Sequence, residues 1–273
     1  MKYIKTNNDL SVPMLGLGVF KVQEGNQCVE AVKYALQIGY RHIDTASIYG
    51  NEESVGVAIK ESGIPREEIF LTTKVWNEVQ RTGVVENALN ESLKLLGTDY
   101  VDLYLVHWPV PGKYVDTWLQ LEKIYKSGRV KSIGVSNFHT HHLEDLRKVW
   151  SVVPVMNQIE LHPDLSQKTI IDYCKEHGII PQAWSPLGAA KNTLLENPLL
   201  ISIGKKYGKT PAQVILRWNI DCGVVTIPKS VTPSRIKENI SIFDFELTQE
   251  EVTQIDGLNK NKRTGADPDN FSF

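Results

Sequence analysis

The chain has 273 residues and a formal net charge of −2, with 41% hydrophobic and 23% charged residues. This balance gives no basic field suited to nucleic acid or an anionic membrane, so a small molecule is the expected partner. No apolar run reaches the length of about 18 residues that a membrane span needs, and the segment 1–8 lacks the apolar core of a signal peptide, so we expect a cytoplasmic protein.

The first elements expected are two short strands at 3–5 and 11–13, which flank a polar turn and would form a hairpin at one end of the fold. Strand-like and helix-like segments then alternate. The expected strands are 14–20, 42–44, 69–74, 101–107, 132–136, 155–160, 179–184 and 224–227. The expected helices are 29–36, 55–60, 84–96, 117–125, 142–149, 169–177, 198–207 and 212–220.

Four polar residues stand at the ends of expected strands about 30 residues apart, which is the length of one strand-helix unit: Asp44, Lys74, His107 and Ser136. Eight such units without a change in composition predict an α/β fold, a (β/α)8 TIM barrel formed by residues 1–273 as one domain. The N-terminal hairpin and extra helices after the seventh and eighth strands would complete it. A doubly wound sheet is the alternative. In a barrel the strand ends face one mouth, so these side chains would converge.

The segment 39–50 supplies an acid and a phenol to that mouth. Gly39 is placed to end a helix, Asp44 ends the next strand, and Tyr49 follows on the loop. A lysine held by Asp44 would stay charged, and near Tyr49 it would lower the pKa of the phenol from about 10. His107 would offer a neutral hydrogen-bond donor to a carbonyl oxygen. Together these side chains would polarise a carbonyl, either for an external hydride or for an internal nucleophile.

Each of these residues also has an ordinary structural explanation. Asp44 could cap the helix that follows it, and His107 could be a core histidine with its hydrogen bonds satisfied. Lys74 is harder to explain in this way, because a buried lysine is rare unless it is paired. The coincidence of the three at successive strand ends favours a functional site.

No complete GxGxxG motif is present, so a Rossmann-type nucleotide site is not expected. The segment 227–239, after the eighth expected strand, is the better phosphate site. Lys229 and Arg235 flank a helix start that also carries Ser and Thr donors. A capped surface helix with ordinary charges is the alternative.

Five motifs carry a family resemblance that runs from Gly16 to about Asn259. They are 39–46 with Tyr49, 73–76, 102–109, 133–138 and 227–230. In this order they resemble the aldo-keto reductases. The short loop 109–116 resembles in particular the bacterial branch with glyoxal and methylglyoxal reductases and 2,5-diketo-D-gluconate reductases.

The resemblance implies NADPH-dependent reduction of aldehydes or ketones, such as methylglyoxal or glyoxal, to alcohols. Tyr49 would donate the proton, Lys74 and Asp44 would lower its pKa, and His107 would orient the carbonyl. Trp184 would stack on the nicotinamide in place of the tyrosine of many members. The substrate pocket would be lined by Phe20, Tyr49, Trp76, His107 and Trp108, although its aromatic residues could equally be core.

The resemblance also implies the residues that would hold NADPH or NADP+. The nicotinamide carboxamide would contact Ser136, Asn137 and Gln158. The pyrophosphate would lie along Ser185, Leu187 and Gly188. The 2′-phosphate would contact Lys229, Ser230 and Arg235, and the adenine would contact Glu238 and Asn239. The remaining cofactor residues would be Gly18, Val19 and Asp44.

Three other functions compete with this reading. A Schiff-base aldolase could use Lys74, although a paired lysine is a poor nucleophile. A regulatory barrel could bind the nucleotide with little turnover, but it would be expected to lack one of the four catalytic residues. A metal-dependent hydrolase would need the cluster His139, His141 and His142, which lies at a helix start with no carboxylate converging from other strands, so we expect a polar helix turn and no metal.

Cys28, Cys174 and Cys222 are widely spaced without a CxxC pair, so we expect buried, reduced thiols. No exposed apolar stripe is evident, so a monomer is expected.

Overall fold

The computed structural model describes residues 1–188 and 193–273. Its main sheet has eight parallel strands in chain order: β3 (Leu17–Gly18), β4 (His42–Asp44), β5 (Phe70–Val75), β6 (Leu103–Val106), β7 (Ile133–Ser136), β8 (Met156–Glu160), β9 (Ile180–Trp184) and β10 (Val225–Thr226). A parallel bridge between Leu15 and Thr226 joins the two ends of this order. There the Gly16 N–H donates to the Thr226 carbonyl and the Thr226 N–H to the Met14 carbonyl, each at 2.9 Å. The predicted (β/α)8 barrel is therefore confirmed.

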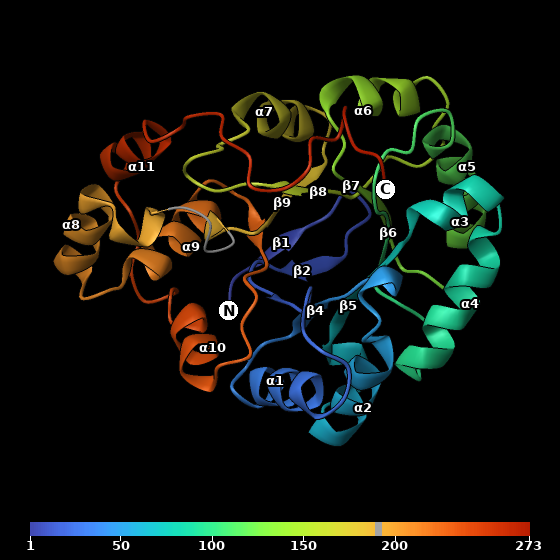
Figure 1. Cartoon of the computed structure of the whole chain (residues 1–273), viewed down its shortest axis with the longest axis horizontal. Coiled ribbons are helices and arrows are strands. Elements are labelled where there is room, and N and C mark those ends of the chain that lie inside the picture. Colours follow the sequence, from blue (N-terminus) through green and yellow to red (C-terminus); the bar gives the residue numbers. More distant parts are fainter. Residues whose placement is uncertain (189–192) are drawn as a thin grey trace.

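Helices surround the sheet on its outer side (Figure 1). They are α1 (Asn26–Gln37), α2 (Glu52–Ser62), α3 (Asn77–Thr82), α4 (Val85–Leu96), α5 (Tyr114–Lys126), α6 (Thr140–Arg147), α7 (Lys168–Glu176), α8 (Pro198–Tyr207), α9 (Pro211–Asp221), α10 (Pro233–Ile240) and α11 (Gln249–Asp256). The helices α8 and α9 after β9, and α10 and α11 after β10, are the predicted additions. The short polar helix α3 has no expected counterpart, because it lacks an apolar periodicity.

The helix ends follow from local chemistry. Thr210 begins α9 with a capping box, its hydroxyl accepting from the Gln213 N–H at 3.3 Å, and Pro211 occupies the first helical position. Gly39 follows α1 with φ at 107°, and its N–H donates to the Leu36 carbonyl. A side chain at this φ would be strained, so glycine allows the chain to turn from α1 into β4.

The N-terminal hairpin closes one end of the barrel. Strands β1 (Tyr3–Lys5) and β2 (Ser11–Pro13) pair antiparallel, and they lie in the centre of the ring of strands in Figure 1. The buried Val12 packs against the start of several barrel strands, including Phe70, Leu103 and Ile180. The hairpin thereby seals the N-terminal end, and the C-terminal strand ends are left to form the mouth.

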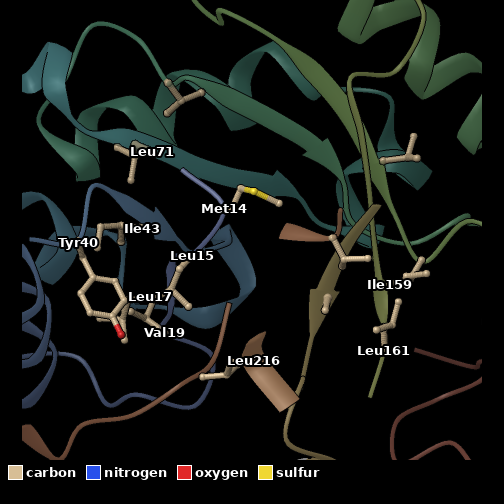
Figure 2. Packing of buried hydrophobic residues seen from close by; sticks show 14 of the residues in the cluster. Met14, Leu15, Leu17, Val19, Tyr40, Ile43, Leu71, Ile159, Leu161 and Leu216 are labelled. Carbon is tan, nitrogen blue, oxygen red and sulfur yellow. The ribbon is translucent and has the colours of Figure 1, made fainter. Parts of the chain in front are cut away.

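The barrel wall is built from apolar side chains of neighbouring strands. Figure 2 shows Leu15, Leu17 and Ile43 side by side, and all three are almost fully buried. Gly134 on β7 is required by close packing, because an added Cβ would lie 2.6 Å from the Met156 carbonyl oxygen of β8. This glycine lets β7 and β8 approach, and it places Ser136 beside Gln158.

The cysteines are free thiols, as expected. Cys28 and Cys174 are buried, and Cys222 is partly exposed. Burial is the main cause that raises the pKa of each thiol to about 12, so each keeps its proton near neutral pH. Within residues 1–188 and 193–273, no helix is long and apolar enough to cross a membrane.

Candidate active site

A buried ammonium group lies at the centre of the mouth. Lys74, near the end of β5, is fully buried, and its Nζ donates to Asp44 Oδ1 at 2.5 Å, to the Thr45 carbonyl at 2.8 Å and to the Tyr49 hydroxyl at 3.4 Å. Burial lowers the lysine's pKa, and the Asp44 charge opposes that effect. The structure thus brings together Asp44 and Lys74, which the repeat length placed at one mouth, and Tyr49 from the loop after β4.

The other oxygen of Asp44 is held as firmly. Asp44 Oδ2 accepts from Gln158 Nε2 at 2.7 Å, and the same amide nitrogen donates to Gln182 Oε1 at 2.8 Å. Asp44 does not cap the next helix, because Asn51 occupies the N-cap position of α2. The carboxylate is therefore fixed by two strand-borne donors and cannot turn away from Lys74.

Tyr49 ends a short 3-10 turn, Ser47–Tyr49, between β4 and α2. The expectation that Lys74 would lower its pKa is wrong for this structure. Burial is the main cause that raises the pKa of Tyr49 well above 10, and the Asp44 charge adds to the rise. Counting only the lysine charge failed because Asp44 neutralises it at contact distance while burial disfavours the phenolate. The phenol consequently holds its proton across the neutral range.

His107 follows β6 and is 6% exposed. Burial, with a contribution from the Lys74 charge, holds its pKa well below 6.5, so the imidazole is neutral. Its ring meets those of Trp76 and Tyr49 edge to face, with centroids 5.1 and 5.7 Å away. Among the described residues its buried Nδ1 has no hydrogen-bond partner.

The residues expected around the nicotinamide form one hydrogen-bonded chain. The Asn137 amide donates to the His107 carbonyl at 2.9 Å, and its oxygen accepts from Trp184 Nε1 at 2.8 Å. The Ser136 hydroxyl donates to the Gln158 carbonyl at 2.9 Å. Asn137 adopts a φ of 66°, a strained value for a side-chain-bearing residue that the surrounding bonds maintain.

Two further groups of expected cofactor residues lie on loops beside this chain. The Val19 N–H, next to Gly18 at the end of β3, donates to the Asp44 carbonyl at 3.1 Å. After β9, Ser185 has a φ of 48° and its carbonyl accepts from the Gly188 N–H at 2.8 Å. The half-buried Leu187 lies inside that turn.

The expected phosphate site occupies the start of α10. Lys229 and Arg235 are both exposed, and neither forms an ion pair with any residue that the structure describes. The Ser230 hydroxyl accepts from the Thr232 N–H at 3.1 Å. Two cations without a partner beside a helix N-terminus fit an anionic group such as a phosphate.

Of the two expected adenine contacts, one is hydrogen-bonded within the protein and the other is almost buried. Glu238 Oε1 accepts from the Thr210 hydroxyl at 2.7 Å. Asn239 is 4% exposed. They lie on the same helix as Arg235.

The substrate side of the mouth is aromatic. Phe20 is 54% exposed, and its ring centroid lies 5.0 Å from that of Tyr49. Trp76 lies against His107, as described above, and Trp108 is almost buried.

Sequence reasoning missed the C-terminal tail, residues 257–273. Phe273 stacks on Trp76 with centroids 5.8 Å apart and an interplanar angle of 3°, and both Phe271 and Phe273 lie 5.2 Å from Trp108. Figure 1 shows the red tail passing from α11 along the side of α7 and α6 to end beside β6 and β7. The available signal was a pair of phenylalanines in an otherwise polar segment.

The tail is anchored at the end of β8. Glu160 is buried, and Oε1 accepts from the Thr264 N–H at 2.6 Å and Oε2 from the Gly265 N–H at 3.1 Å. Glu160 Oε1 also pairs with His162 Nε2 at 3.0 Å. A Cβ added at Gly265 would overlap the Trp184 ring. The tail is thus in close contact with the aromatic ring expected to face the nicotinamide.

The sequence that forms this barrel and its mouth matches one protein family over most of its length. The chain belongs to the aldo/keto reductase family, whose profile matches residues 14–260, and the resemblance drawn from the motifs is confirmed. Glyoxal reductase from Bacillus subtilis (strain 168) is 54% identical over 270 residues, which are 99% of this chain and 97% of that protein.

Two further comparisons agree with this membership. Methylglyoxal reductase DkgA from Salmonella typhimurium is 48% identical over 262 residues, which are 95% of this chain and 94% of that protein. Among solved structures, a Bombyx mori aldo-keto reductase in complex with NADP has a TM-score of 0.91 at 39% identity, covering 98% of this chain and 96% of that chain.

Proposed function

We propose that the protein is an NADPH-dependent reductase of small aldehydes and ketones, with dicarbonyls such as glyoxal and methylglyoxal among its substrates. The relatives named glyoxal reductase and methylglyoxal reductase support this substrate class. The observation that carries the reaction type is the buried ammonium of Lys74, which is shared between Asp44 and the Tyr49 hydroxyl.

The residues present fit the cofactor. The exposed Lys229 and Arg235 have no ionic partner among the described residues and supply the charge that a 2′-phosphate requires, which favours NADPH over NADH. Trp184 offers an aromatic face whose orientation is fixed by its hydrogen bond to Asn137. When bound, NADPH supplies the hydride.

The chain's own residues supply the rest of the chemistry. Tyr49 holds a proton at its hydroxyl, and we assign it as the donor to the carbonyl oxygen. As the phenolate develops, the Lys74 ammonium stabilises the new negative charge, while Asp44 keeps that ammonium in place. The neutral His107 orients the carbonyl oxygen without competing to protonate it, and the aromatic wall excludes water.

Removing the proton donor tests this function. We expect the purified protein to oxidise NADPH with methylglyoxal, and we expect Tyr49→Phe to lose at least about a hundredfold in kcat with little change in NADPH affinity. Phe retains the ring contact with Phe20, so packing is preserved. Turnover at the wild-type rate in the variant would remove Tyr49 from the role of donor.

The competing functions find no support here. A Schiff-base aldolase needs Lys74 to reach a substrate carbon, but this side chain is fully buried and already makes three hydrogen bonds. A nucleotide sensor with little turnover would not need the four residues of the mouth to contact one another. In this structure Lys74 contacts Asp44 and Tyr49, and the rings of Tyr49 and His107 lie edge to face.

We further propose a single-domain monomer that works in the cytoplasm. Free thiols with raised pKa values are compatible with a reducing compartment. Among the large apolar side chains that the described surface exposes, Phe20 and Phe273 belong to the mouth, and others such as Tyr3, Val149 and Leu195 belong to separate parts of the chain. Light scattering after size exclusion tests the monomer, and a dimer mass at micromolar concentration would contradict it.

A further inference from the structure

Three histidines and one aspartate meet at the start of α6, away from the Tyr49 site. His139, His141 and His142 come from the first turn, and Asp269 comes from the tail, 130 positions from His139. One ligand atom from each of the four lies within 4.8 Å of the others. The sequence analysis considered only carboxylates from other strands, whereas this carboxylate comes from the tail.

His139 serves to orient the carboxylate. Arg263 Nη2 lies 2.8 Å from His139 Nε2, and an arginine can only donate, so Nε2 is the acceptor. The proton of the neutral ring is therefore on Nδ1, which donates to Asp269 Oδ2 at 2.8 Å. This leaves Asp269 Oδ1 free to face the other two histidines.

The three remaining atoms form a triangle with the spacing of metal ligands. His141 Nε2 lies 3.1 Å from both His142 Nε2 and Asp269 Oδ1, and His142 Nε2 lies 3.5 Å from Asp269 Oδ1. Ligands bound tetrahedrally at about 2.0–2.1 Å are about 3.3 Å apart. With the Asp269 carboxylate ionised, hydrogen bonds alone cannot satisfy all three pairs of atoms. At least one pair is left with two lone pairs or two N–H groups facing each other.

We propose that His141 Nε2, His142 Nε2 and Asp269 Oδ1 bind a divalent transition-metal cation of the zinc class. Two imidazoles and one carboxylate are the ligand set that such ions accept, with a fourth position open to solvent on the exposed side of His141. His139 is the positioning residue that directs the carboxylate.

Two features limit the affinity. A neutral His142 that binds through Nε2 carries its proton on Nδ1, so the hydrogen bond that Nδ1 accepts from the His139 N–H must open. The helix N-terminus and Arg263 are also positive. We therefore expect weaker binding than at a closed four-ligand zinc site.

The consequence of binding concerns the tail. Asp269 lies two residues before Phe271, which contacts Trp108 at the mouth. A cation bound by α6 and Asp269 together would add a contact between two existing anchors of the tail. These are Glu160 with Thr264 and Gly265, and Asn77 with the Phe273 carbonyl. The inference does not depend on the reaction assigned to the mouth.

The test uses the full chain, freed of metal by a chelator. We expect calorimetry with ZnCl2 to give one ion per chain, and His141→Ala and Asp269→Asn each to weaken binding at least about tenfold. His177→Asn, a histidine outside the cluster, is the matched control and should retain wild-type affinity. With Co2+ the spectrum should lack a thiolate charge-transfer band, because the proposed ligands are two histidines and an aspartate and include no cysteine.

A second measurement follows the tail itself. Zinc should slow amide hydrogen exchange in residues 263–273 of the wild type and leave exchange in Asp269→Asn unchanged, with both proteins showing the same thermal unfolding. Absence of stoichiometric zinc binding, equal weakening in His177→Asn, or a cobalt–thiolate band would overturn the proposal. Protection of the tail amides from hydrogen exchange that changes with pH alone, with no ion bound, would also overturn the proposal.

Discussion

The indole N–H of Trp184 donates to the side-chain oxygen of Asn137 at 2.8 Å. This bond joins the end of β9 to the end of β7, and the Asn137 amide continues it to the His107 carbonyl. The ring expected to stack on the nicotinamide and the histidine expected to orient the substrate are therefore positioned by one asparagine.

Trp184→Phe keeps an aromatic ring and removes this hydrogen bond. We expect NADPH to bind about fivefold more weakly, which corresponds to about 1 kcal/mol for a neutral hydrogen bond. Trp184→Leu should weaken binding further, because it also removes the aromatic face. Calorimetric titration of NADPH measures both variants. Unchanged affinity in Trp184→Phe would show that the bond does not position the ring for the cofactor.

Much of the barrel could be predicted because its strands and helices follow from local hydrophobic patterns in the sequence. The repeat of about 30 residues placed Asp44 and Lys74 at one mouth, and the structure brings them into contact. The tail could not be found in this way. It has no strand or helix periodicity, and its contacts, such as Thr264 with Glu160 over 104 positions, depend on the folded barrel.

The predicted direction of the Tyr49 pKa shift was wrong for a different reason. The sequence shows which charges are near each other, but it does not show how deeply they are buried. Burial is the main cause of the shift at Tyr49, at His107, where the Lys74 charge adds to it, and at Lys74, where it outweighs the Asp44 charge. Only a structure provides that quantity.

Gly265→Ala tests the contact between the tail and the cofactor site. An added Cβ would overlap the Trp184 ring, so either the ring or the tail must move. We expect a severalfold rise in KM for NADPH and a cost of about 1–3 kcal/mol in the free energy of unfolding.

Gly257→Ala is the matched control in the same tail, because Gly257 has an ordinary φ of −65° and an added Cβ there lies 3.2 Å from the nearest atom. Steady-state kinetics and chemical denaturation compare the two. Equal KM values for NADPH in Gly265→Ala and Gly257→Ala would mean that the tail moves to accommodate the added Cβ without displacing Trp184.

Variants of the buried pair Asp44 and Lys74 distinguish its effect on stability from its effect on catalysis. Asp44→Asn leaves an ammonium without its counter-ion, which should cost about 3–5 kcal/mol in the free energy of unfolding. Adding Lys74→Met removes the uncompensated charge, so the double variant should recover most of that loss while remaining inactive. Urea denaturation and methylglyoxal turnover give the two readouts. A double variant no more stable than Asp44→Asn would contradict the account of this pair.

The cofactor preference depends on the start of α10. We expect Lys229→Met with Arg235→Met to weaken NADPH binding about a hundredfold or more and NADH binding by less than about threefold, because charge-assisted bonds to a phosphate contribute about 1.5–3 kcal/mol each. Lys237→Met, an exposed lysine of the same helix, is the control. Equal losses for both nucleotides would move the phosphate site elsewhere.

The pH dependence of reduction distinguishes two views of Tyr49. Donation requires the protonated phenol, and burial raises its pKa well above 10. The single-turnover rate at saturating NADPH should therefore stay level from about pH 6.5 to about pH 9, and a fall at higher pH would report proton loss from Tyr49 or from Lys74, whose pKa burial lowers. His107 adds no decline at the acid end of this range, because its lowered pKa keeps the imidazole neutral there.

A phenol acidified by Lys74 would behave in the opposite way, because its rate of reduction would begin to fall near neutral pH as the proton is lost. Stopped-flow measurement of NADPH oxidation with methylglyoxal reads the rate directly, and the stability of NADPH is checked at each pH without enzyme. Lys74→Met supplies the comparison: without the ammonium the phenolate is stabilised less, so the slow residual reaction should show no decline up to about pH 10. A wild-type decline between about pH 7 and about pH 8 would mean that cofactor binding outweighs the effect of burial on Tyr49.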